Sequence, residues 1–510
     1  MKLPLLLLFC ICMTLHVIAK TSPVVVTTTS GKLHGTEQNG VMSFRGVRFG
    51  QSATGPLRWE PPVPFISAAV HNATTLAPSC IQQFPFATSA FTQSIFNNPP
   101  PASENEDCLF LNVWAPSADI NEKKPVVFWL YGGGLGFGTA SLPGYDGTSL
   151  AANQNIVVVT SNYRTNIFGF PGSSDLPITH NNLGFLDQEL ALEWVQLNIA
   201  RFGGDPDKVT IMGQSAGAGS AGLAIVRDRI HTPFRAGVLL SGVPVSSSPI
   251  PSFSSFDGFA NSVGCNQAPG LTRLNCLKKV PAATIRNFTN GPLSGAFGPV
   301  VDNVTAFTNP LERIRAGASA GVPIILGNME NDGTVFVVGV TNLTEFVEAQ
   351  LPGTGVTADL LRSLYPGQND ASVIASSYRD FVFRCPDELW SAAVRGAGVS
   401  SVFRYTYGAV FEDLQIFPDA GAWHSSEIGP LFGNFNKSTA TPVEVAWSTT
   451  FQTAIANFIK NPEVSPAVHW PKYITGPPAQ TFAKLAYNGN VEPGNFVDPV
   501  ASGSLVPLVL

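Results

Sequence analysis

Six short apolar segments constrain the fold of this chain more than any other feature. They lack the alternation of apolar and polar residues typical of half-exposed strands, so we expect strands that are buried on both faces. Between them, residues 183–201 carry large side chains three and four positions apart, which predicts a helix. Strands that alternate with helices predict an α/β fold with a mainly parallel sheet and helices on both faces. The expected strands are 125–130, 155–160, 209–212, 236–240, 322–326 and 402–407.

The 510 residues contain neither an internal repeat nor a long linker. The candidate site residues described below lie far apart in the sequence, so one fold has to bring them together. We therefore expect residues 20–510 to form a single domain. In a sheet of this kind, chemistry gathers at the carboxyl ends of the strands.

Residues 1–19 have the pattern of a secretory signal peptide, with one lysine, an apolar run and small residues at Val17 and Ala19. The mature chain is expected to begin near Lys20 and to be secreted. No later segment has the run of about 18 apolar residues that a membrane helix needs. The C-terminal VPLVL is too short for a GPI signal, so we expect no stable membrane anchor.

The cysteines and sequons are consistent with an extracellular chain. Of seven cysteines, Cys10 and Cys12 lie in the leader, which leaves an odd number, so one thiol is expected to be free or paired between molecules. Short separations indicate loops closed by Cys80 with Cys108 and by Cys265 with Cys276, although the sequence alone leaves the pairing open. Five N-x-S/T sequons are candidate glycosylation sites: Asn72, Asn287, Asn303, Asn342 and Asn436.

The charge of the chain argues against nucleic-acid binding. The formal net charge is −6 and 13% of the residues are charged, about half the usual fraction of roughly 25%. No cluster of lysine and arginine is present that could follow a phosphate backbone. We expect a small-molecule substrate and no nucleic-acid partner.

The segment Gly213-Gln214-Ser215-Ala216-Gly217 matches the G-x-S-x-G pattern of a nucleophile elbow, which requires a strand before the serine and a helix after it. Ser215 follows the expected strand 209–212 and precedes small residues that lead into a helix-compatible run. A second match, centred on Ser319, has the opposite order, so we interpret it as a helix-to-strand turn. For Ser215 the alternative is a glycine-rich turn without chemistry.

Acyl transfer develops a negative charge on the substrate oxygen, which preorganised N–H donors must stabilise. The segment Tyr131-Gly132-Gly133-Gly134 directly follows the expected strand 125–130. Glycines there allow the backbone to approach a substrate closely. We favour an oxyanion site over a merely flexible loop.

A serine nucleophile needs a histidine base, and the histidine needs a carboxylate to orient it. When the chain order is serine, acid, histidine, only His424 and His469 follow Ser215. His424 lies in a loop of small residues after the expected strand 402–407, whereas His469 lies beside bulky Trp470. We therefore favour His424 as the base and a structural role for His469.

The acid is expected just after the strand 322–326, where Glu330 and Asp332 both occur. Either could be an ordinary loop carboxylate. The glycine after Asp332 permits a sharp turn beside the site and slightly favours that residue.

Taken together, these motifs resemble the type-B carboxylesterase and lipase family, which includes the cholinesterases, and in particular its secreted fungal carboxylesterases. The similarity covers nearly the whole mature chain, and EDCLFLNVW is its most specific motif. The segments that carry it are FRGVRFG at 44–50, EDCLFLNVW at 106–114, YGGG at 131–134, SNYRTNIFGF at 161–170, GQSAG at 213–217, NDGTVF at 331–336 and HSSEIG at 424–429.

This resemblance implies an α/β-hydrolase fold with Ser215, Asp332 and His424 as the catalytic triad. It implies oxyanion donors at Gly133, Gly134 and Ala216. It also implies the disulfides Cys80–Cys108 and Cys265–Cys276 and a structural ion pair between Arg45 and Glu106. No metal or cofactor is implied.

The chain departs from the family pattern at several positions. Gln214 replaces a glutamate found in many members, and Cys385 matches the first half of a bridge whose second half this chain lacks. The loop between Cys80 and Cys108 has phenylalanines but not the tryptophan that binds choline in cholinesterases by cation–π attraction. Choline esters are therefore not the expected substrates. In the family's lipases this loop is a lid, but its phenylalanines could equally pack as core.

The expected activity is hydrolysis of apolar or aromatic carboxylic esters through an acyl-enzyme on Ser215. Two alternatives remain open at this point. The same residues could transfer the acyl group to another metabolite in a tailoring step of secondary metabolism, or the chain could be a non-catalytic cholinesterase-like binding protein. The oligomeric state does not follow from the sequence.

Overall fold

The computed structural model describes residues 21–96, 103–227, 232–245, 252–475, 481–490 and 494–497. The expected signal peptide lies outside these residues. Within them, no helix is both long and apolar enough to cross a membrane.

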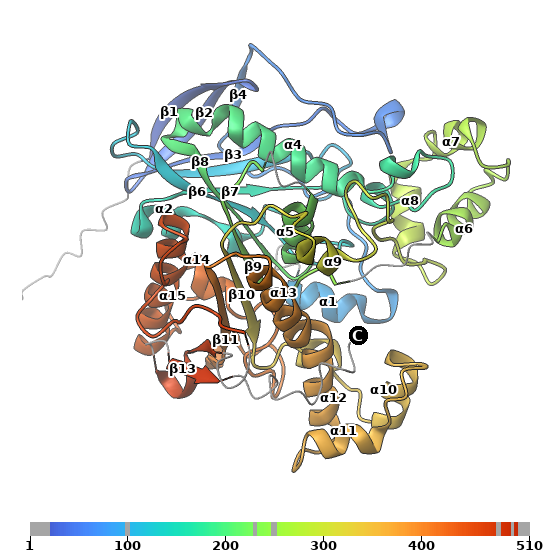
Figure 1. The fold of residues 1–510 in the computed structure, drawn as a ribbon. Coiled ribbons are helices and arrows are strands. Elements are labelled where there is room, and N and C mark those ends of the chain that lie inside the picture. The colour runs from blue at the N-terminus through green and yellow to red at the C-terminus, as the bar shows by residue number, and fades with distance from the viewer. Residues whose placement is uncertain are drawn as a thin grey trace, which may run out of the picture.

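A single sheet of 13 strands runs through the molecule (Figure 1). Its order is β1-β2-β3-β5-β7-β6-β8-β9-β10-β11-β12-β13, with β4 paired to β2. The pairs from β7 to β12 are all parallel, whereas those toward the two edges are antiparallel apart from β2–β4. The strands are β1 Ser22–Thr28, β2 Gly31–Gln38, β3 Val41–Arg48, β4 Val70–Asn72, β5 Phe110–Pro116, β6 Lys124–Leu130, β7 Val157–Ser161, β8 Gly204–Gln214, β9 Ala236–Leu240, β10 Ile324–Met329, β11 Val402–Tyr407, β12 Thr481–Leu485 and β13 Gly494–Val497.

The six strands expected from apolar runs are confirmed as the parallel centre of the sheet, β6 to β11. The predicted bounds of β9 and β11 match the structure, and both strands are buried throughout. The prediction was wrong for the starts of β7 and β10, which begin at Val157 and Ile324 rather than at residues 155 and 322. Strand β1 was not among the expected strands. Its residues alternate between half-buried and exposed, so it contains no continuous buried run.

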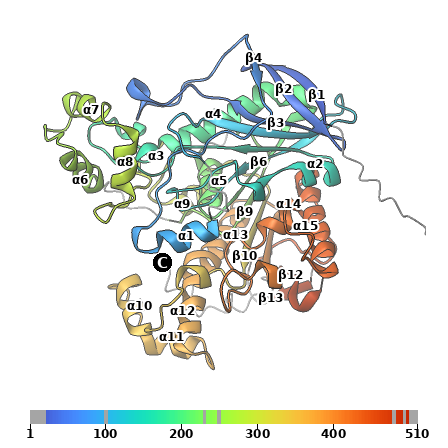
Figure 2. The ribbon, with the colours of Figure 1, turned by 180° about the vertical axis from the view of Figure 1, so that it is seen from behind.

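Helices cover both faces of the sheet (Figures 1 and 2). Helices α2 (Thr148–Gln154), α14 (Ile428–Phe432) and α15 (Pro442–Lys460) pack together on one face. The opposite face carries α4 (Leu183–Asn198), α5 (Ala216–Arg227), α9 (Pro310–Arg315) and α13 (Cys385–Gly396). The expected helix 183–201 is α4, which passes into the 3₁₀ turn Ile199–Phe202. These helices bury the central strands, so the hydrophobic core lies on both sides of β6 to β11.

Two smaller groups of helices stand away from the sheet, each with its own apolar core. One contains α6 (Ser254–Ser262), α7 (Leu271–Leu277) and α8 (Ala282–Thr289). The other contains α10 (Leu343–Gln350), α11 (Ala358–Leu364) and α12 (Asp370–Arg379). Figure 2 shows the short helix α1 (Ser89–Phe96) on the side of the molecule toward which both groups project.

The disulfides Cys80–Cys108 and Cys265–Cys276 are present, in the pairing that the resemblance implies. They close segments with sequence separations of 28 and 11 residues. Cys385 is buried in α13, apart from both bridges.

The expected ion pair between Arg45 and Glu106 is wrong. Glu106 instead accepts two hydrogen bonds from Arg58, at 2.5 and 2.7 Å. Arg45 lies at an irregularity in the pairing of β3 with β5, between Phe44 and Val47. Arg58 comes from the turn after Gly55–Leu57, and its guanidinium also donates to the carbonyl of Val280. The pair therefore joins the Cys80–Cys108 loop to the helices that surround the second disulfide.

Candidate active site

Ser215 lies between the end of β8 and the start of α5, the position of a nucleophile elbow. Its backbone has φ of +55°, a strained value for a residue with a side chain. The serine N–H donates to the carbonyl of Leu240 on β9, and its own carbonyl accepts from Gly219 in α5. These hydrogen bonds to β9 and α5 hold the serine in the strained turn, where its hydroxyl can stand above the sheet.

Glycine is required where this turn meets the loop after β6. A Cβ atom on Gly217 would lie 2.1 Å from the carbonyl oxygen of Leu130, and one on Gly132 would lie 2.9 Å from the Cβ of Ser215. These distances are too short for any side chain. The glycine loop and the elbow therefore approach each other closely, with Gly133 and Gly134 lining the same pocket as Ser215.

His424 and Asp332 form a buried pair, although they come from different loops. The Nδ1 atom of His424 lies 2.8 Å from Oδ1 of Asp332, and the two residues are 2% and 0% exposed. The other carboxylate oxygen of Asp332 accepts hydrogen bonds from the Ser241 hydroxyl at 3.0 Å and the Met329 N–H at 2.8 Å. The acid is therefore fixed on both oxygens.

The structure separates this pair from the other sequence candidates. Glu330 pairs with Arg379 and Arg384 and does not reach the histidine. His469 is exposed, well after the end of α15. Ser319 lies in the turn between α9 and β10, as its sequence context predicts.

Several residues around the histidine were not identified from the sequence. The ring of His424 packs between Phe336 and Phe383, with centroid distances of 5.0 and 4.8 Å. Phe383 comes from a π-helical turn, Asp380–Arg384, and such turns are frequent at functional sites. Phe336 ends the motif NDGTVF and Phe383 lies in no motif, but only the tertiary structure shows that both rings contact the histidine.

The sequence marks Gln214 only as a departure from the family pattern, yet its side chain contacts His424 directly. Its Nε2 atom lies 3.0 Å from Nε2 of His424. This nitrogen is the one that faces away from Asp332 and would exchange a proton with a nucleophile. Gln214 thus contacts the ring nitrogen of His424 that does not face Asp332.

A second buried acid lies near Asp332. Glu427 is fully buried, and burial, with the charge of Asp332 as a further cause, raises the pKa of its carboxyl to about 8. At neutral pH this group is therefore mainly protonated. Glu427 therefore adds no second negative charge beside Asp332.

A pocket of about 500 Å³ opens over Ser215 and His424. Its walls combine aromatic and aliphatic side chains with glycines, and none of the described residues that line it is Asp, Glu, Lys or Arg. Ile95 and Phe96 at the end of α1 contribute to one wall, and Ile416 and Trp423 to another. A pocket of this composition accommodates an uncharged, largely apolar molecule.

Comparisons with known proteins agree with this geometry. The carboxylesterase family model matches residues 22–496. The chain is 29% identical to fumonisin B1 esterase from Sphingopyxis macrogoltabida over 91% of its length and 87% of that protein. It is 28% identical to secreted lipase 5 from Gibberella zeae, with 92% of each chain covered.

A solved structure of PNB esterase has the same architecture, with a TM-score of 0.78 and 28% sequence identity over 94% of this chain and 99% of that one. The expectation of an α/β-hydrolase fold is thus confirmed. The family model, which spans nearly all of the described residues, supports a carboxylic ester hydrolase. This chain belongs to the carboxylesterase family.

Proposed function

We propose that this enzyme hydrolyses uncharged, apolar or aromatic carboxylic esters with Ser215 as nucleophile, His424 as general base and acid, and Asp332 as the orienting carboxylate. The observation that carries the proposal is the buried 2.8 Å contact between His424 and Asp332, in a pocket that also contains the strained elbow serine.

The reaction begins when His424 takes the proton of the Ser215 hydroxyl and the serine oxygen attacks the ester carbonyl. Collapse of the tetrahedral intermediate breaks the bond to the alcohol, and His424 gives its proton to the leaving alkoxide. Water, deprotonated by the same histidine, then attacks the acyl-enzyme. The carboxylic acid leaves and Ser215 regains its proton.

The oxyanion donors are the backbone N–H groups of Gly133, Gly134 and Ala216. Gly133 and Gly134 line the pocket, and Ala216 is the first residue of α5, where helix N–H groups lack helical partners. Each such donor typically contributes about 10²- to 10³-fold to the rate.

The absence of Asp, Glu, Lys and Arg among the described lining residues supports an apolar ester substrate. Phe96 belongs to the segment between Cys80 and Cys108, and its ring packs near Phe137 and Trp423 at the pocket. The phenylalanines of this segment do not all have one role. Phe84 is part of the buried interior, whereas Phe86 is exposed to solvent.

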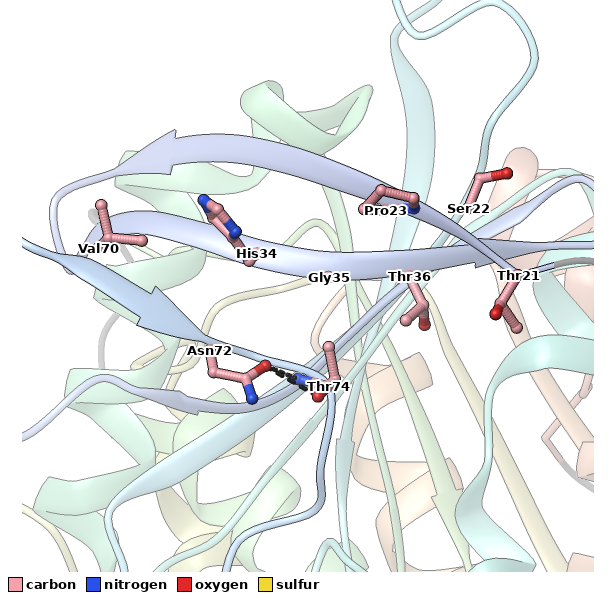
Figure 3. A pocket seen from close by; sticks show the side chains of 9 residues that line it. All are labelled: Thr21, Ser22, Pro23, His34, Gly35, Thr36, Val70, Asn72 and Thr74. Atoms are coloured by element: carbon pink, nitrogen blue, oxygen red, sulfur yellow. Dashed lines mark hydrogen bonds between the residues drawn. The ribbon is translucent and has the colours of Figure 1, made fainter.

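Secretion and glycosylation form part of the same proposal. The two disulfides and the similarity to a secreted lipase support an extracellular location. All five sequon asparagines are exposed, as modification requires: Asn72, Asn287, Asn303, Asn342 and Asn436. Figure 3 shows Asn72 at the rim of an open hollow beside β1 and β2, where its Oδ1 accepts hydrogen bonds from Thr74.

The decisive experiment is hydrolysis of p-nitrophenyl esters from acetate to palmitate by the purified secreted protein and by Ser215→Ala. We expect turnover by the wild type and loss of at least about 10³-fold in the variant. The preferred chain length would distinguish a short-chain esterase from a lipase. No turnover by folded wild-type protein on any ester would contradict the proposal and favour a binding protein or an enzyme restricted to one acceptor.

A further inference from the structure

Two buried polar atoms in the catalytic pocket are not used by the triad mechanism. They belong to Gln214 and Tyr145, which both line the pocket and are only 2% and 8% exposed. Because the two side chains are otherwise enclosed, the small exposed part of each faces the pocket. Other walls of the pocket, at Ile95, Phe96 and Ile416, are apolar. Polar selectivity for a substrate therefore depends on a few enclosed groups.

The orientation of the Gln214 amide follows from its contact with the base. Nδ1 of His424 donates its hydrogen to Asp332, so Nε2 of the neutral ring is an acceptor. The amide therefore presents its NH₂ group to Nε2, at 3.0 Å, and its Oε1 atom points elsewhere. A Cβ atom on Gly132 would lie 2.6 Å from Oε1, which places this oxygen beside the glycine loop. Among the described residues, Oε1 of Gln214 accepts no hydrogen bond.

Tyr145 is held firmly in the wall of the same pocket. The side-chain amide of Asn434 donates to the backbone carbonyls of the residues before and after Tyr145, at 3.2 and 2.8 Å. The tyrosine ring packs against Trp129 and Phe432, with centroid distances of 5.3 and 5.8 Å. Its hydroxyl has no hydrogen-bond partner within the described part of the chain. Burial raises the pKa of Tyr145, so this hydroxyl keeps its proton and can donate it to a ligand.

Both groups lie on the side of the leaving alcohol. When the tetrahedral intermediate collapses, the leaving oxygen must be within hydrogen-bond reach of Nε2 of His424, and Gln214 contacts that same nitrogen. From His424 the chain runs through α14 to Asn434, which supports the turn of Tyr145. Several residues of this stretch line the pocket. Residues 424–434 thus form one wall that begins at the base and ends at Tyr145.

A hydroxyl group on the alcohol portion of a substrate matches the two free atoms. Its oxygen can accept from the Tyr145 hydroxyl, and its hydrogen can be donated to Oε1 of Gln214. A charged group would find no counter-ion, because none of the described residues that line the pocket is Asp, Glu, Lys or Arg. A purely apolar group beside Tyr145 would leave the buried hydroxyl without a partner, which costs free energy.

We infer that Tyr145 is a specificity-determining residue and that the preferred substrates are esters whose alcohol portion carries a further hydroxyl group, as in a monoester of a glycol or of glycerol. The inference rests on the proposed function and specifies its substrate class. The reaction is unchanged: the bond between the acyl carbon and the alcohol oxygen breaks, His424 protonates that oxygen, and water releases the carboxylic acid from Ser215.

The test compares 2-hydroxyethyl octanoate with propyl octanoate, which differ only by a terminal hydroxyl in place of a methyl group. Titration of the released octanoic acid measures kcat/KM for each ester. For the wild type we expect a ratio of about tenfold or more in favour of the hydroxyl ester, because an enclosed donor discriminates against a ligand that leaves it unpaired. In Tyr145→Phe, which keeps the ring and removes only the hydroxyl, the ratio should fall to about one.

Tyr378→Phe is the matched control. The ring of Tyr378 stacks on Phe336 at 5.1 Å, but Tyr378 does not line the pocket, so loss of its hydroxyl should leave the ratio unchanged. A wild-type ratio near one would overturn the inference without any variant. A preference that survives in Tyr145→Phe would overturn it too, since another lining group such as Ser425 would then bind the hydroxyl.

The same measurements separate this inference from the proposed function. If p-nitrophenyl esters are hydrolysed in a Ser215-dependent way but the hydroxyl ester is not preferred, only the inference fails. If no ester is hydrolysed, the proposed function fails and the inference falls with it.

Discussion

Nδ1 of His424 lies 2.8 Å from Oδ1 of Asp332, and both side chains are shielded from solvent. The second oxygen of Asp332 is held by Ser241 and by the backbone of Met329. The carboxylate can therefore orient the imidazole with little freedom of its own. This relationship leads to a first prediction about catalysis.

Asp332→Asn should reduce kcat by about 10⁴-fold, because an amide in this place favours the wrong tautomer of His424 and no longer stabilises its charge. Steady-state hydrolysis of the best p-nitrophenyl ester measures the change. Ser241→Ala removes only one hydrogen bond from the acid and should reduce kcat far less. An Asp332→Asn enzyme that kept a tenth of the wild-type activity would exclude the proposed role.

Gln214→Glu should move the acidic limb of the kcat/KM profile to higher pH by about one unit. A carboxylate 3.0 Å from Nε2 of His424 would favour the protonated imidazole, which cannot act as the base. Rates measured between about pH 5 and pH 9 would detect the shift. Gln214→Ala, which adds no charge, should not produce it, and an unshifted profile for the glutamate variant would contradict the contact.

Glu427→Gln should make stability less dependent on pH. Burial raises the pKa of Glu427 to about 8 in the folded protein, against about 4.3 in an unfolded chain. The unfolded state therefore loses its proton first, and the free energy of unfolding falls as pH rises from about 4 to about 8. This contribution is on the order of 4 kcal/mol.

The amide variant lacks this titration. Urea unfolding at about pH 5 and about pH 8 should show a larger loss of stability for the wild type than for Glu427→Gln. Equal losses in the two proteins would show that the carboxyl is not held in its neutral form.

Arg58→Ala should destabilise the fold by about 3 to 5 kcal/mol, because it leaves Glu106 buried without its partner. The side chains of this pair are only 6% and 9% exposed. Arg48→Ala is the matched control, since Arg48 and Asp107 are 23% and 32% exposed and their contact should contribute about 1 kcal/mol or less. Urea unfolding measures both, and similar effects of the two substitutions would contradict the distinction.

The sequence by itself determined the centre of the fold and the position of the elbow that carries Ser215. The strands at 236–240 and 402–407 could be read directly because parallel strands buried on both faces need unbroken apolar runs. Ser215 was separated from Ser319 by local order alone, since an elbow needs a strand before it and a helix after it. Such features depend only on residues that are neighbours in the sequence, so they can be predicted from the sequence alone.

The tertiary structure decided which side chains contact one another at the site. Glu330 and Asp332 are two residues apart, but Glu330 turns toward Arg379, whereas Asp332 folds back onto the Met329 N–H and reaches a histidine 92 residues away. Likewise, Arg58 and not Arg45 contacts Glu106. Gln214 contacts His424 although 210 residues separate the two in the sequence. Contacts over such separations depend on the side from which each side chain leaves its loop, and that direction is fixed only when the surrounding elements pack.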